Sequence, residues 1–157
     1  MYNNQADAFI TTAKTIKKVA EKSKSENAVH TINALTFGTH VYQQREELIA
    51  NSNDKQRTDG ITITTDLGSG KEYTSCIKIF EDGRHLVYME LNKTLAEEVG
   101  AACYQMNIFT QMHEGDQECN KIKAYDERSN EISAQKFNIQ NGQMTEVSPT
   151  KTQGRAQ

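Results

Sequence analysis

Residues 72–91, "EYTSCIKIFEDGRHLVYMEL", have the pattern of a β-hairpin, and the fold class follows from it. β-branched and aromatic residues alternate with other residues on both sides of Asp82-Gly83, and Asp-Gly is a strong signal for a hairpin turn. A two-residue turn at this dipeptide places Ile77 opposite Tyr88. In that register both faces of the hairpin carry apolar side chains. One face should therefore pack on helices, and the other should need a covering element or a partner.

The preceding stretch "TDLGSGKEY", residues 65–73, ends like a phosphate-binding loop but lacks the chemistry of one. In the motif G-x-x-x-x-G-K-[ST], backbone amides cradle the phosphate and the last hydroxyl binds magnesium. Here Thr65 stands in place of the first glycine, and the carboxylate of Glu72 stands in place of the hydroxyl. We therefore interpret residues 68–70 as a hairpin loop and expect no nucleotide to bind.

The length of that loop fixes which face of the strand at residues 61–67 is buried. A three-residue loop pairs Ile63 with Ser75. A two-residue loop pairs Asp66 with Lys71 and turns the isoleucines to the other face, because a shift of one residue reverses every side chain. The sequence leaves both registers open.

Two helices are predicted before these strands. The stretch "QADAFITTAKTIKKVAEK", which begins at Gln5, repeats apolar residues at three- and four-residue spacing and carries lysines on the opposite face. This pattern is typical of an amphipathic helix, and we interpret its lysines as a solvated surface rather than a membrane contact. A second helix is expected within residues 27–50, as one helix or as two shorter helices interrupted at Gly38.

A third helix is predicted over residues 94–113, "TLAEEVGAACYQMNIFTQMH". Thr94 and Glu97 have the spacing of a capping box. Apolar side chains then recur at helical spacing along one face: Leu95, Val99, Ala102, Met106, Phe109 and Met112. We interpret this stripe as core packing.

Three further strands are expected at residues 120–126, 131–140 and 143–147, the last two joined at Asn141-Gly142. The predicted fold class is therefore α+β, with N-terminal helices and an antiparallel sheet of two three-stranded meanders separated by an amphipathic helix. We expect residues 1–148 to form a single domain and residues 149–157 to be a disordered tail.

Composition limits the classes of function. The chain of 157 residues has a net charge of −3, and residues 60–118 carry 4 Lys+Arg against 10 Asp+Glu, which argues against phosphate contacts and nucleic acid. No apolar run is long enough for a signal peptide or a membrane span. Three cysteines without C-x-x-C spacing suit reduced thiols and a cytoplasmic, soluble protein.

No catalytic or metal-binding motif is present. The four histidines show neither H-x-x-H nor H-E-x-x-H spacing, so we expect no metal and no cofactor. A nucleophilic Cys76 or Cys103 would need a positioned histidine, and a buried, inert thiol is the ordinary state of Cys103. We predict no catalytic residue, and we retain a Cys/His hydrolase-like enzyme or ligand-binding protein, with a site assembled from distant residues, as the alternative.

Two element orders are similar to known families. Residues 28–113 resemble a double-stranded-RNA-binding domain in order, but Glu97 and Glu98 stand where that family presents lysines to phosphates. The whole order, a leading helix, a strand meander, a helix and further strands, resembles small acidic secretion chaperones. The second resemblance implies a protein partner rather than a chemical reaction.

The sequence therefore predicts a non-enzymatic protein-binding module, such as an adaptor, an inhibitor or a secretion-chaperone-like protein, that uses an apolar sheet or helix face. The predicted binding residues are Val87, Met89, Leu91, Phe9 and Ile16. An uncovered apolar hairpin face would be an unusual patch on a monomer, so a homodimer is expected as one outcome. In the other outcome the first helix covers this face and the chain stays monomeric.

Overall fold

The computed structural model describes residues 5–50, 62–111 and 119–147. These residues form three helices and seven strands. In chain order the elements are α1 (Gln5–Lys22), α2 (Ala28–Ala50), β1 (Thr62–Gly68), β2 (Lys71–Ile79), β3 (Arg84–Leu91), α3 (Lys93–Val99), β4 (Cys103–Phe109), β5 (Asn120–Tyr125), β6 (Glu131–Gln140) and β7 (Gln143–Glu146).

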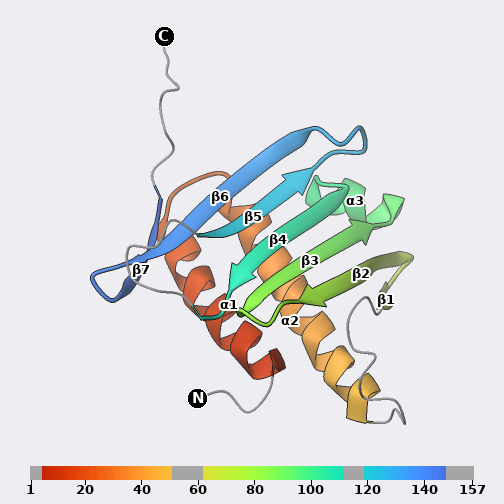
Figure 1. The fold of residues 1–157 in the computed structure, drawn as a ribbon. Coiled ribbons are helices and arrows are strands. Elements are labelled where there is room, and N and C mark those ends of the chain that lie inside the picture. Colours follow the sequence, from red (N-terminus) through yellow and green to blue (C-terminus); the bar gives the residue numbers. More distant parts are fainter. Residues whose placement is uncertain (1–4, 51–61, 112–118, 148–157) are drawn as a thin grey trace.

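The strands form one antiparallel sheet in the order β1-β2-β3-β4-β5-β6-β7, and both long helices lie on the same face of it (Figure 1). The short α3 lies at one end of the strands, where β3 passes into β4. The predicted α+β class, with N-terminal helices and an antiparallel sheet interrupted by a helix, is confirmed. The two long helices cover one face, and none of the described helices packs over the centre of the opposite face, hereafter the open face (Figure 1).

The helix-covered face holds the core. The burial of side chains alternates along the strands, as β3 shows most clearly, because successive side chains point to opposite faces. The sequence places the large apolar residues at the positions that face the helices: Tyr73, Ile77, Val87, Met89, Tyr104, Met106, Ile108, Ile122 and Phe137. From the helices, the ring of Phe9 stacks on the ring of Tyr42 with centroids 4.0 Å apart.

The helix α2 runs through Gly38 without a break, so the expected alternative of two shorter helices does not occur. A Cβ atom at Gly38 would lie 2.7 Å from Cε of Met106 and 3.2 Å from Cζ of Phe9. The glycine therefore allows α2 to approach both α1 and the sheet closely.

The hairpin at Asp82-Gly83 differs from the prediction by one residue. Its strands pair Ile77 with Val87 and Cys76 with Tyr88, not Ile77 with Tyr88. The reason is a three-residue loop, in which Gly83 adopts a left-handed conformation (φ 91°) and its amide donates to the carbonyl of Phe80. This loop type is common in hairpins. As a result Ile77 of β2 shares the buried face with Val87, Met89 and Leu91 of β3, whereas Leu86 and Tyr88 point to the opposite face.

The helix predicted over residues 94–113 ends much earlier. The helix α3 ends at Val99, and Gly100 caps it with a left-handed φ of 84°. The predicted capping box does not form, because Asn92 is the N-cap and its side chain accepts from the Leu95 amide. Residues 103–109 form the strand β4, which joins the two predicted groups of strands into one meander.

The loop at residues 68–70 is a hairpin turn, as expected. Ile63 pairs with Ser75, the register predicted from a three-residue loop, and an irregularity between Asp66 and Gly68 adjusts the pairing next to the turn. Ile63 is buried on the helix-covered face. The proposed tail at residues 149–157 lies outside the described residues. None of the described helices is both long and apolar enough to cross a membrane.

Candidate functional site: the open face of the sheet

The five residues predicted to bind a partner all lie in the core. Val87, Met89 and Leu91 project from β3 toward the helices, and their exposed fractions are 1%, 0% and 8%. Phe9 and Ile16 of α1 have no exposed surface. The structure thus brings these residues together in the core between the helices and the sheet. This arrangement corresponds to the alternative in which the first helix covers the apolar face of the hairpin.

The side chains between these buried positions form the open face, and the strand registers arrange them in three rows across the sheet. The carboxylate row is Thr74, Glu90, Cys103 and Tyr125. The middle row is Cys76, Tyr88, Gln105 and Lys123. The lysine row is Lys78, Leu86, Asn107, Lys121 and Lys136. Neighbouring rows are two residues apart along a strand, which is about 7 Å.

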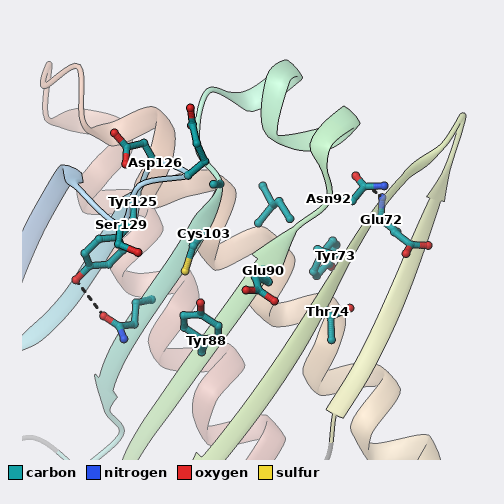
Figure 2. Close-up of a pocket in the computed structure, with 14 residues that line it drawn as sticks. Glu72, Tyr73, Thr74, Tyr88, Glu90, Asn92, Cys103, Tyr125, Asp126 and Ser129 are labelled. Atoms are coloured by element: carbon teal, nitrogen blue, oxygen red, sulfur yellow. Dashed lines mark hydrogen bonds between the residues drawn. The ribbon is translucent and has the colours of Figure 1, made fainter.

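One end of the open face is acidic. A groove of about 670 Å³ lies there, and its lining includes the carboxylates of Glu72, Glu90, Asp126 and Glu127 (Figure 2). In the described part of the chain none of these four carboxylates forms a salt bridge. We refer to these four residues as the acidic end.

Local hydrogen bonds hold the acidic end in place. The side chain of Asn92 accepts from the Leu95 and Glu72 amides and donates to the Gly70 carbonyl at 2.8 Å, so it ties the start of α3 to the turn between β1 and β2. Lys71 of β2 forms a salt bridge with Glu98 of α3. The position of Glu72 is therefore set by a hydrogen bond of its own amide and by contacts of Gly70 and Lys71, the two residues before it.

A tight loop fixes Asp126 on the other side of the groove. Its Oδ1 accepts backbone amides of Arg128 at 2.9 Å and of Asn130 at 2.8 Å. These hydrogen bonds, first the one from the Asn130 backbone, lower the pKa of Asp126 because they stabilise its charged form. Asp126 therefore keeps its negative charge across the neutral range.

The other end of the open face is basic. A second groove, of about 490 Å³, is lined by Lys78, Lys121 and Lys123 together with uncharged side chains of β3 and β4. The ammonium of Lys123 lies 3.3 Å from the Glu131 carboxylate, whereas Lys78, Lys121 and Lys136 form no salt bridge with the described residues. These last three residues are the lysine end.

Apolar surface lies between the two ends. Leu86 is 37% exposed and Tyr88 is 42% exposed, and Tyr88 lines both grooves. Gln105, beside Tyr88 in the middle row, also lines both grooves and accepts a hydrogen bond from the Tyr125 hydroxyl at 3.1 Å (Figure 2). The open face thus combines an exposed aromatic centre with opposite charges at its two ends.

The cysteines on this face lack the surroundings of a nucleophile. Burial raises the pKa of the Cys103 thiol, and the Glu90 carboxylate raises it further, while the hydrogen bond with Tyr88 acts in the opposite direction. That same hydrogen bond is the main reason why the pKa of Tyr88 rises to about 12. Within the described residues no histidine lines either groove, so the described residues do not give Cys76 or Cys103 the histidine that a Cys/His site requires.

The described histidines lie elsewhere. His85 points into the core, and burial, followed by the charge of Arg45, lowers its pKa to about 4. Burial also lowers the pKa of His30, whose Nδ1 lies 3.1 Å from the Tyr104 hydroxyl. Over residues 5–50, 62–111 and 119–147, no three His, Cys, Asp or Glu side chains are grouped so as to hold a metal ion.

The sequence reasoning missed the open face for one reason. Tyr88, Leu86 and Cys76 were assigned faces in a register shifted by one residue, which mixed them with the core positions. The strict alternation of β3, with apolar residues at Val87, Met89 and Leu91, was the signal that could have separated the two sets.

Comparison with known proteins adds no assignment. No protein-family model, curated protein or solved structure matches this chain.

Proposed function

We propose that this chain is a non-enzymatic protein-binding module and that its binding surface is the open face of the sheet. The observation that carries this proposal is the exposed pair Leu86 and Tyr88, which lies close to the acidic end and the lysine end, whose charged groups form no salt bridge within the described residues. Exposed aromatic surface with a charged rim is typical of protein interfaces.

The surroundings of this surface support a binding role over a reaction. The two grooves lie on the surface of the sheet, and within the described residues neither thiol in their lining, Cys76 or Cys103, is accompanied there by a histidine. The proposal includes a reducing, cytoplasmic location, since Cys76, Cys103 and Cys119 are all free thiols.

The proposal replaces the surface expected from the sequence but keeps the kind of function. Val87, Met89 and Leu91 support the binding surface from beneath, because they are the core side of the strand that presents Leu86 and Tyr88. A partner that binds here adds a layer to the uncovered side of the sheet, in the way that two sheets pack face to face about 10 Å apart.

Affinity capture from the native source tests the proposal. The wild-type chain is compared with Leu86→Lys/Tyr88→Lys and with Val29→Lys, a matched control because Val29 is 59% exposed on α2, away from the sheet. We expect a protein that is retained by the wild type and the control but lost from the double variant. Equal retention by all three chains would place the binding surface elsewhere and contradict the proposal.

A further inference from the structure

The charges of the open face are arranged so that the face is complementary to itself. The carboxylate row and the lysine row lie at equal distances on either side of the middle row, because each is two residues away along every strand. A rotation of 180° about an axis that lies in the interface and runs along the middle row exchanges the two rows. Glu90 belongs to the carboxylate row, and Glu72, Asp126 and Glu127 lie beyond this row at the same end of the sheet, so the rotation places the acidic end of one chain over the lysine end of a second copy.

We propose that the open face binds a second copy of this chain in a two-fold dimer whose axis runs along the middle row. This inference rests on the proposed function and names the partner. An interface of this kind uses the same patch on both chains, the commonest symmetry of oligomers. Cys76 and Tyr88, which lie on the axis row, each face their own counterparts.

The charges also exclude the other simple arrangement. A two-fold axis parallel to the strands would superpose the acidic ends of the two chains and the lysine ends as well. Like charges placed opposite one another disfavour an interface strongly. The choice of axis follows from the positions of Glu90, Lys78 and Lys121, none of which has a salt-bridge partner in the described residues.

The two chains of the dimer are in contact through the exposed apolar side chains of the open face. Tyr88 of each chain lies in the middle row, on the two-fold axis, so the two exposed aromatic rings are buried against each other in the interface. Aromatic residues at the centre and charged residues at the rim are the usual distribution in protein interfaces. The core beneath, with α1 and α2 on the far face, stays as it is in the single chain.

Complementary charge reversal tests this arrangement by analytical ultracentrifugation. One variant carries Lys78→Glu and Lys121→Glu, and the other carries Glu72→Lys and Glu90→Lys. We expect the wild type to pass from 17.7 kDa to twice that mass as its concentration rises. Each variant alone should dimerise roughly 10-fold to 100-fold more weakly, because like charges then meet at both ends.

The mixture of the two variants tests whether the open faces of two chains meet with opposite charges opposed. In the mixed dimer a new glutamate faces a new lysine at one end, and an original carboxylate faces an original lysine at the other. An equimolar mixture should therefore recover the wild-type affinity, and salt should weaken both the wild-type and the mixed dimer. Circular dichroism of each variant confirms that it is folded.

Three results would overturn the dimer. They are a wild-type chain that stays at 17.7 kDa at high micromolar concentration, variants that dimerise as strongly as the wild type, and a mixture no tighter than its components. If the wild type is monomeric while Leu86→Lys/Tyr88→Lys still loses a captured protein, the dimer fails and the proposed function stands. If the wild type is monomeric and capture is unaffected, both fail.

Discussion

The hydroxyl of Tyr42 on α2 lies 2.6 Å from Nδ1 of His85 on β3, and neither side chain has exposed surface. Tyr42 also stacks on Phe9 of α1. The hydrogen bond joins α2 to β3, and the stacking joins α1 to the same tyrosine, so the two contacts together link both long helices to a central strand.

Removal of this hydroxyl should destabilise the fold. Tyr42→Phe leaves Nδ1 of His85 without that partner in a buried site, and we expect a loss of about 1–3 kcal/mol in the free energy of unfolding. Tyr125→Phe is the matched control, because the Tyr125 hydroxyl bonds to Gln105 at the exposed surface. Urea denaturation measures both, and equal losses in the two variants would contradict the structural role of the Tyr42 hydroxyl.

Stability should fall in mild acid because of His85. Its pKa is about 4 in the folded chain against 6.5 in the unfolded chain, so the unfolded state binds more protons between these values. The contribution of neutral His85 to the free energy of unfolding is fully present above pH 6.5. It is lost as the pH falls toward 4, by about 3 kcal/mol in total. His30 acts in the same direction, because burial lowers its pKa too.

Chemical denaturation between pH 7 and pH 4 measures this dependence. His85→Gln should make the free energy of unfolding depend less on pH, since glutamine does not titrate. His40→Gln, at an exposed position, should leave the pH dependence as steep as in the wild type. A curve for His85→Gln as steep as that of the wild type would show that other groups cause the loss.

The face assignment predicts opposite effects of lysine at two positions of β3. Met89→Lys buries an ammonium among apolar side chains, and the cooperative unfolding transition should be lost. Leu86→Lys places the same group on the open face, and the free energy of unfolding should change by about 0.5 kcal/mol or less. Thermal unfolding compares them, and a stable Met89→Lys would mean that the register of the hairpin is incorrect.

Close packing at Gly38 should make the stability of the fold sensitive to a larger side chain at this position. Gly38→Val should cost about 1–3 kcal/mol, because the added side chain meets the ring of Phe9 and must displace the terminal methyl group of Met106. Gln43→Val is the control, since it introduces the same β-branched residue at an exposed site of α2. A Gly38→Val variant as stable as the control would show that α2 does not approach the sheet closely.

Much of the fold could be predicted because local patterns agree with the tertiary structure. Two-residue alternation in β2, β3 and β6 and the three- and four-residue spacing in α1 each have one simple reading. Residues 103–109 do not, because Met106 fits both the helical stripe from Leu95 and the strand alternation with Tyr104 and Ile108. Residues 103–109 form a strand because they pair with β3 on one side and with β5 on the other.

The candidate site was harder to predict, since it depends on register rather than on motif. The lysine row and the carboxylate row exist only when five strands are paired correctly, and a shift of one residue at Gly83 scatters them over both faces. Which face the first helix covers also depends on contacts between residues far apart in sequence, such as Phe9 with Tyr42. The open face is therefore visible only in the folded chain.

The rate of maleimide alkylation of Cys76 reports directly whether the open face is covered by bound protein. Cys76 is exposed in the middle row, whereas Cys103 and Cys119 are buried. Mass spectrometry of the peptide that contains Cys76 should show slower alkylation as the concentration of the chain, or of a captured partner, increases. In Leu86→Lys/Tyr88→Lys the rate should be independent of both. A Cys76 rate in the wild type that stays constant under both conditions would contradict the account.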